Sequence, residues 1–219
     1  GQIIVNSPLP VTYVPDDNFE AYLEANGMGN GVPYDDYVTT ANINTVTFLD
    51  VSNASINNLT GIEDFTSLTT LYCFDNFLTS LDLSNLSLLT DLRCYDNQLT
   101  SLDLSFNDDI NAVNCHNNQI TNLNLSQITT LTYLNCSNNQ LTSLDVSNNI
   151  ALNQLICHNN QLTNLVVSNG NNSNFIGFST TSNPSLTCIE VDDVAWSTTN
   201  WLTIDAQHYF STNCFTQTY

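Results

Sequence analysis

Residues 68–84 read LTTLYCFDNFLTSLDLS, and residues 89–105 read LTDLRCYDNQLTSLDLS. Cysteines mark the same place in five such copies and follow one another at intervals of 21 residues: Cys73, Cys94, Cys115, Cys136 and Cys157. A period of about 20–50 residues indicates one supersecondary unit repeated along an axis, in which each copy is too small to bury its own apolar face. The chain is therefore predicted to form one elongated domain with a core that runs through all the copies.

The first half of each copy follows the pattern L-x-x-L-x-(L/C)-x-x-N-x-L, which resembles the leucine-rich repeat. The resemblance covers residues 46–170, about six coils, because a looser copy precedes the five regular ones. It implies a short strand over the L-x-(L/C) part of each coil and a parallel sheet on the concave side. Leu71 and Cys73 are then expected to point inward, and Tyr72 and Phe74 outward, because side chains alternate along a strand.

The second half of each copy alternates apolar and polar residues with a period of two, as in residues 78–84. This pattern favours strand or extended chain on the convex side and predicts almost no helix in the array. The predicted fold class is therefore mainly β, a leucine-rich-repeat solenoid. An asparagine follows each strand and is predicted to satisfy backbone groups at the turn: Asn76, Asn97, Asn118, Asn139 and Asn160.

Residues 1–45 form the predicted N-terminal cap, because a solenoid exposes its core unless its ends are covered. Phe19 and Leu23 stand at helical spacing after a Pro-Asp-Asp start, which predicts one short amphipathic helix near residues 15–24. The Gly-rich and then acidic residues 27–41 are predicted to be loop.

Residues 171–219 form the predicted C-terminal cap, with a last strand over residues 186–191. Cys188 and Cys214 both lie there, and a disulfide between them would close a loop of 26 residues and stabilise the fold by about 3–4 kcal/mol. We expect that bond, which implies an oxidising compartment. The helix-led start and this tail resemble the caps of secreted bacterial leucine-rich-repeat proteins of the internalin type.

The five periodic cysteines are expected to be buried, free and inert, because they stand where other repeats carry Leu or Val. A straight ladder does not bring four thiolates to one point, as zinc requires. In-register neighbours also fit the torsion of a disulfide poorly, and an odd number cannot pair completely.

One Lys/Arg against 21 Asp/Glu gives a net charge of −20, and Arg93 is the only strong cation. Nucleic acid and anionic lipid are therefore excluded as partners, because both are bound through Lys and Arg. No apolar run approaches the roughly 18–20 residues that cross a bilayer, so no membrane insertion is expected. We expect a monomer that is secreted or exposed on the cell surface, where acidic charge keeps it soluble.

The concave face is predicted to carry aromatic residues, two of the three histidines and the only arginine. An exposed aromatic strip is typical of a contact surface, although rings can also stack along a sheet merely to stabilise adjacent strands. The predicted ligand-contact residues are Tyr72, Phe74, Arg93, Tyr95, His116 and Tyr133.

The opposite face is predicted to carry a row made of Asp82, Asp103, Asn124, Asp145 and Val166. Calcium could relieve the repulsion between Asp82 and Asp103, but it prefers six or more oxygen ligands, so a solvated row without a metal is the main expectation. No cofactor is predicted. A threonine ladder from Thr79 to Thr163 leaves ice binding as a distant alternative.

The sequence shows none of the motifs of catalysis: no nucleophile with a base, no H-E-x-x-H and no phosphate loop. The function predicted from the sequence is therefore non-enzymatic: recognition of a protein or glycan through the concave face, as the resemblance to internalins implies. The alternative is a structural or calcium-associated acidic surface protein, in which the aromatic strip is incidental.

Overall fold

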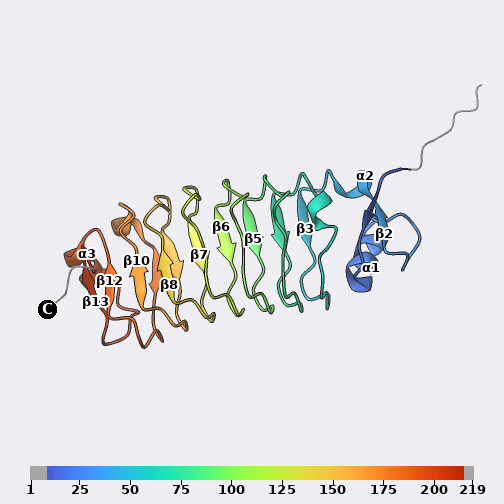
Figure 1. The fold of residues 1–219 in the computed structure, drawn as a ribbon. Coiled ribbons are helices and arrows are strands. Elements are labelled where there is room, and N and C mark those ends of the chain that lie inside the picture. Colours follow the sequence, from blue (N-terminus) through green and yellow to red (C-terminus); the bar gives the residue numbers. More distant parts are fainter. Residues whose placement is uncertain (1–8, 215–219) are drawn as a thin grey trace, which may run out of the picture.

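A computed structural model describes residues 9–214 as a rod of stacked coils with a cap at each end (Figure 1). Seven strands form one parallel sheet, the long sheet, in the order β3, β4, β5, β6, β7, β9 and β11. Their bounds are Phe48–Asp50, Thr70–Tyr72, Asp91–Arg93, Ala112–Asn114, Tyr133–Asn135, Gln154–Ile156 and Gly177–Ser179. The predicted mainly β solenoid is confirmed.

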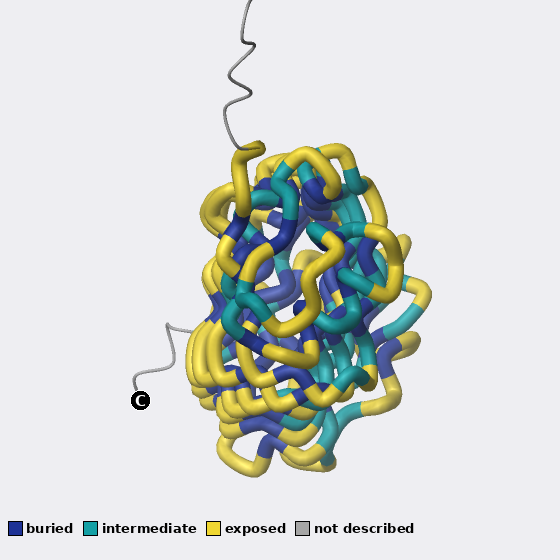
Figure 2. The backbone as a smooth tube through the Cα atoms, turned by 90° about the vertical axis from the view of Figure 1, so that its right-hand side faces the viewer, coloured by how far each residue is buried: buried dark blue, intermediate teal, exposed yellow. Residues whose placement is uncertain are grey.

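The inward and outward residues of each coil follow the predicted alternation. Leu71 and Cys73 have no exposed surface. Tyr72 and Phe74 are half-buried on the outer face of the long sheet, which is the face that the sequence analysis calls concave. Figure 2 looks along the rod and shows the buried parts of successive coils gathered inside a largely exposed outline. Each coil thus buries its apolar side chains against its neighbours, as a solenoid requires.

A second parallel sheet lies on the other side of the coils, but only toward the C-terminal end. Its strands run in the order β8, β10, β12 and β13 and span Ser143–Asp145, Asn164–Val166, Cys188–Glu190 and Tyr209–Ser211. The equivalent segments of the earlier coils, such as residues 78–84, form no strand. The predicted strand or extended chain therefore becomes a paired strand only in the later coils.

The predicted asparagine ladder closes the turns after the long sheet. The Asn118 side-chain amide donates to the carbonyls of Cys94 and Cys115 at 3.0 and 3.1 Å, and its oxygen accepts from the Leu99 amide at 2.9 Å. Asn183 repeats these contacts in a further coil, so the repeating architecture continues past residue 170. The residues just before the ladder asparagines adopt positive φ angles of 52–60°: Asp75, Asp96, Asn117, Asn138, Asn159 and Ser182.

The N-terminal cap contains the predicted helix and more structure than expected. Helix α1 spans Asp17–Ala25, and the Asp16 carboxylate caps it by accepting from the amides of Asn18 and Phe19. The prediction of a loop over residues 27–41 is wrong at its end, where strand β2 (Tyr37–Thr39) and helix α2 (Thr40–Ile43) form. Strand β2 pairs antiparallel with β1 (Val11–Tyr13), a partner that the local sequence of this acidic stretch does not reveal.

The C-terminal cap holds the predicted disulfide, which joins Cys188 on β12 to Cys214 across 26 residues. Helix α3 spans Val194–Asn200, and its first turn is capped by the Asp193 carboxylate, which accepts from the Trp196 amide. Two short 3-10 turns, Ile62–Asp64 and Asn172–Asn174, complete the elements. Within residues 46–170, all of them described, Ile62–Asp64 is the only helical segment, so the prediction of little helix holds there.

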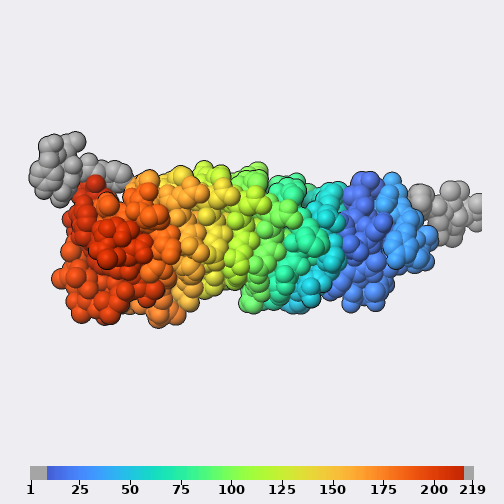
Figure 3. All heavy atoms as spheres, turned by 90° about the horizontal axis from the view of Figure 1, so that it is seen from below, coloured from blue at the N-terminus to red at the C-terminus, as the bar shows by residue number. Residues whose placement is uncertain are grey.

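The rod has a simple order along its length. Figure 3 shows residues of similar number grouped along it, from the N-terminal cap to the C-terminal cap. None of the helices among residues 9–214 is long and apolar enough to cross a membrane.

Candidate functional site: the outer face of the long sheet

Three rows of side chains cross the outer face of the long sheet, because neighbouring strands pair in register. The first row is Phe48, Thr70, Asp91, Ala112, Tyr133, Gln154 and Gly177, and the second is Asp50, Tyr72, Arg93, Asn114, Asn135, Ile156 and Ser179. Backbone bonds between coils place Phe74, Tyr95, His116, Ser137 and His158 in a third row just beyond the strands. All six residues predicted as ligand contacts stand on these rows.

Five rings on adjacent coils form a continuous aromatic strip: Phe48, Tyr72, Phe74, Tyr95 and His116. The centre of the strip is a parallel stack, with Tyr95 lying 4.4 Å from Phe74 and 4.5 Å from His116 between ring centroids. The Phe48 ring meets the Tyr72 ring edge-on at 5.4 Å. Phe48 is 55% exposed and the other four rings are half-buried, so the strip keeps surface available for contact.

A hollow of about 350 Å³ lies beside the strip and is lined by Asp91, Arg93, Ala112, Asn114 and Tyr133. Ala112 creates the space, because it stands between Asp91 and Tyr133 in the first row and carries only a methyl group. Tyr133, the predicted contact farthest along the sheet, therefore joins the site as a wall of this hollow.

Asp91 lies at the centre of the polar contacts of this face, although it is not among the residues predicted as ligand contacts. Its Oδ2 accepts hydrogen bonds from the Tyr72 hydroxyl at 3.1 Å and from the Arg93 guanidinium at 3.2 Å. The Arg93 Cζ in turn lies 4.2 Å from the centre of the Tyr72 ring. The signal that could have identified Asp91 is its position two residues before the only arginine, on the same face of a strand.

Carboxylates lie close to the aromatic strip, and their charges shift the pKa values of its rings. Burial, followed by the charge of Asp91, raises the pKa of Tyr72, and burial, followed by the charge of Asp96, raises the pKa of Tyr95. Burial lowers the pKa of His116, against the opposing effect of Asp96, whose carboxylate lies 4.0 Å from the ring. The strip therefore presents neutral rings among carboxylates near neutral pH.

Comparison with known proteins by sequence gives one limited match. The chain is 41% identical over 72 residues to internalin J of Listeria monocytogenes serotype 4b (strain F2365). The matched segment makes up 33% of this chain and 8% of that protein. The chain thus matches a small part of a much longer relative. No family model matches the chain.

Comparison by structure extends the likeness along most of the rod. The functional domain of internalin J from Listeria monocytogenes, described as including a cysteine ladder, aligns with a TM-score of 0.65 and 28% identity. The alignment covers 87% of this chain and 55% of that domain. The chain is an internalin-like leucine-rich-repeat solenoid.

Two further internalins of Listeria monocytogenes strain 4b F2365 share the fold with this internalin-like solenoid at 20% identity. Internalin C2 aligns with a TM-score of 0.53 over 94% of this chain and 99% of its own. Internalin F aligns with a TM-score of 0.58 over 90% of this chain and 68% of its own.

The cysteine ladder of the internalin-like solenoid lies entirely in the core. All five periodic cysteines are buried free thiols, as predicted. Burial raises the pKa of Cys73, Cys115 and Cys157 to about 12, so the reactive thiolate is scarce at neutral pH.

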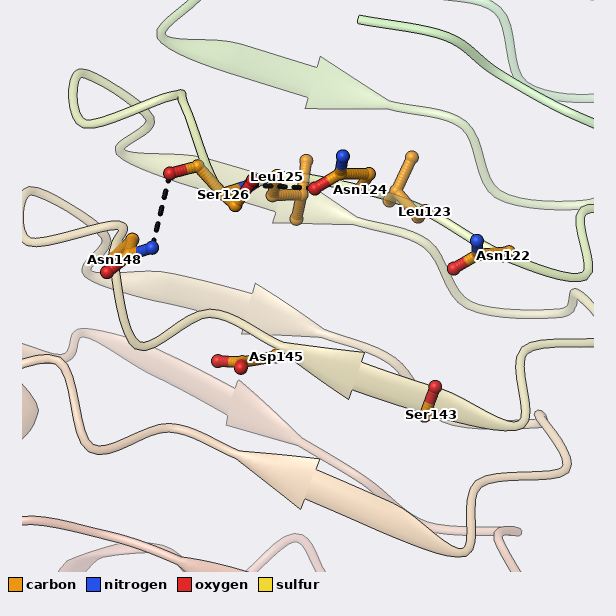
Figure 4. A pocket seen from close by; sticks show the side chains of 8 residues that line it. All are labelled: Asn122, Leu123, Asn124, Leu125, Ser126, Ser143, Asp145 and Asn148. Carbon is orange, nitrogen blue, oxygen red and sulfur yellow. Dashed lines mark hydrogen bonds between the residues drawn. The ribbon is translucent and has the colours of Figure 1, made fainter. Parts of the chain in front are cut away.

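On the opposite face, polar side chains of the predicted row accept hydrogen bonds from the backbone of the turn that follows them. The Asp82 and Asp103 carboxylates each accept from the backbone amide two residues later at 2.9 Å, which lowers the pKa of both groups. Asn124 makes the same bond to the Ser126 amide and lies beside a polar hollow of about 300 Å³ where β8 begins (Figure 4). The expectation that Asp82 and Asp103 are solvated without a metal stays a prediction, and calcium binding there stays the alternative.

The described residues bring together another group of carboxylates in the N-terminal cap, at Asp17, Glu20 and Asp36. The fully buried Glu20 carboxylate already accepts from the backbone amides of Asp35 and Asp36 at 3.1 and 3.2 Å. These bonds tie the segment before β2 to helix α1 and give Glu20 a structural role.

Proposed function

We propose that this internalin-like solenoid is a non-enzymatic binding protein that recognises a protein partner through the outer face of its long sheet. The aromatic strip and Arg93, with Tyr133 at the neighbouring hollow, make the contact. Seven strands about 4.8 Å apart give a face about 30 Å long, which suits a macromolecule better than a small metabolite.

The observation that supports this proposal is the uneven distribution of rings along equivalent positions. In the second row Asn135 and Ile156 take the place of Tyr72, and in the third row Ser137 takes the place of Tyr95. The strands that carry these smaller residues pair in the same parallel register as the others. Ring stacking is therefore not needed to hold the sheet, which favours recognition as the reason for the strip.

The relatives and the disulfide support a location outside the cell. Internalin J and the two other solved internalins share the fold, and the Cys188–Cys214 bond belongs to the type that forms and persists in oxidising compartments. We propose that binding takes place at the cell surface or after secretion.

The test uses substitutions that the sheet already accepts in other coils. A Tyr72→Asn, Phe74→Ser and Tyr95→Ser variant copies the residue types found at Asn135 and Ser137. The control replaces Thr79, Thr100 and Thr121, which are exposed on another side of the coils, by alanine. Both variants and the parent protein are applied to an array of cell-surface proteins and glycans.

We expect the parent and the threonine control to bind the same protein, and the strip variant to bind it at least about tenfold more weakly, because buried aromatic anchors dominate interface energies. Melting curves of all three proteins check that the fold is kept. Equal binding by the strip variant and the control would contradict the proposal, and selective binding to a glycan would change the ligand class.

A further inference from the structure

The hollow beside the aromatic strip has the dimensions of a single side-chain pocket. Its volume is about 350 Å³, and its walls are Asp91 on β5 and Tyr133 on β7. Two strand spacings separate these walls by about 10 Å, and between them Ala112 leaves the space above β6 open. Asn114 and Arg93 complete the lining.

The Asp91 carboxylate, which lines this hollow, has one oxygen with unused hydrogen-bonding capacity. Its Oδ2 accepts from Tyr72 and Arg93, whereas its Oδ1 is buried and has no hydrogen-bond partner among the described residues. A carboxylate can accept about four hydrogen bonds, and leaving a buried oxygen unpaired costs free energy. A positively charged donor in the hollow would relieve this cost once a rotation of the Asp91 carboxylate turns this oxygen toward it.

The surroundings favour a cation on balance: Arg93, the one strong cation, is already paired with Asp91, and further carboxylates lie nearby. The charges of Asp50, Asp75 and Asp96 act on the tyrosines of the strip, and the chain as a whole carries −20. The opposite wall, Tyr133, is an aromatic ring, and a ring together with a carboxylate is a favourable setting for a basic group.

The protein itself contains an example of this chemistry next to the hollow. The Arg93 guanidinium lies 4.2 Å from the centre of the Tyr72 ring and 3.2 Å from the Asp91 carboxylate. One basic side chain is thus already held by a tyrosine and Asp91, and the hollow offers Asp91 with a second tyrosine on its other side.

We propose that this hollow is a socket for a lysine or arginine side chain of the protein partner, held between the Asp91 carboxylate and the Tyr133 ring. The inference rests on the proposed function, since it assigns a partner chemistry to the same face. The partner would therefore contact this face with a basic segment that lies across β5, β6 and β7.

The probe is a fluorescent hexaarginine peptide, with the hexacitrulline analogue as the uncharged match of nearly equal shape. Fluorescence anisotropy at about 150 mM NaCl gives each dissociation constant while screening long-range attraction. The variants are Asp91→Asn, which removes the charge, and Ala112→Tyr, which fills the hollow without changing any charge. Tyr133 occupies the same row as Ala112, so a tyrosine side chain suits that position.

Asp145→Asn is the matched control, because Asp145 is exposed on the opposite face and the substitution changes the net charge equally. We expect hexaarginine to bind the parent protein at least about tenfold more tightly than hexacitrulline, in line with a charge-assisted contact. Asp91→Asn and Ala112→Tyr should each weaken hexaarginine binding about tenfold. Asp145→Asn should leave it unchanged within about twofold.

Equal binding of the two peptides would overturn the socket, as would equal losses in Asp91→Asn and Asp145→Asn, which would indicate diffuse charge attraction. These failures are distinct from failure of the proposed function. If the array still shows loss of partner binding in the strip variant, recognition through the face stands and only the basic socket falls.

Discussion

The side chain of Asn118 shows how much of this fold depends on single residues. Its amide bridges the carbonyls of Cys94 and Cys115, which belong to successive coils, and its oxygen holds the Leu99 amide. These backbone groups are buried, so removing the bridge would leave three of them without this partner. A buried group without a partner costs about 1–3 kcal/mol.

Asn118→Ala is expected to lower the free energy of unfolding by about 2–4 kcal/mol, because packing relieves only part of that cost. Urea unfolding followed by circular dichroism measures the change. Asn122→Ala, at an exposed position, serves as the control and should stay within about 0.5 kcal/mol of the parent. A change at Asn118 no larger than that of the control would show that the ladder is dispensable.

The cysteine ladder makes a second prediction at the same scale. Iodoacetamide near pH 8 should modify none of the five buried thiols in the folded protein, since their raised pKa values and burial suppress attack. In denaturant without reductant five cysteines should react, and after reduction all seven should react. Intact mass distinguishes these states, and labelling of the folded protein would contradict the assigned burial.

Residue directions were predictable from sequence, but the hollow was not. The two-residue alternation around Cys73 and Cys94 fixes which side chains face outward, and it correctly put Tyr72 and Phe74 on the outer face. The hollow depends on one small residue, Ala112, between larger residues contributed by coils 21 residues away on each side. Only the register of the strands brings these three residues together.

At the scale of elements, the long sheet was predictable and the second sheet was predictable only in part. The same alternating pattern occurs in residues 78–84 and in β8, but only the later coils pair on that side. In the earlier coils, bonds such as Gln98 N to Leu78 O at 2.8 Å connect this side at one point. A single copy does not show which of these segments pair, because residues 80–82 and β8 carry the same Ser-Leu-Asp sequence.

The caps lack the repeat, and the predictions there were correspondingly weaker. Helix α1 has its own signals, an N-cap carboxylate and buried Phe19 and Leu23, and was expected. Strand β2 and helix α3 were not expected, because each depends on distant partners. The α3 region packs around Trp201, whose ring stacks on Phe178 at 3.9 Å between centroids.

The disulfide yields a prediction at this scale. A Cys188→Ala and Cys214→Ala variant should lose about 3–4 kcal/mol of stability in the cap, the value expected for a closed loop of 26 residues. In a solenoid each coil contacts mainly its neighbours, so the loss should remain local. Hydrogen exchange should speed up in β12 and β13 and remain slow in β4 and β5; equal acceleration along the whole rod would contradict this.

The whole molecule has a net charge of −20, with 21 Asp and Glu residues and one Arg. The mutual repulsion of the carboxylates opposes folding. Raising NaCl from about 0.02 to 0.5 M should therefore raise the melting temperature by a few degrees, about 2–6 °C, as salt screens that repulsion. Calcium chloride at matched ionic strength should add nothing further. A larger rise at millimolar calcium, reversed by a chelator, would favour the calcium-associated alternative.

The central claim, that the outer face of the long sheet is the recognition surface, is tested most directly by hydroxyl-radical footprinting with the partner that the array selects. The exposed Phe106 and Tyr209, which lie away from this face, provide internal references within the same chain. The account predicts that bound partner lowers labelling of Tyr72, Tyr95 and Tyr133 and leaves the two references unchanged. Protection of the references with unchanged labelling of those three tyrosines would contradict it.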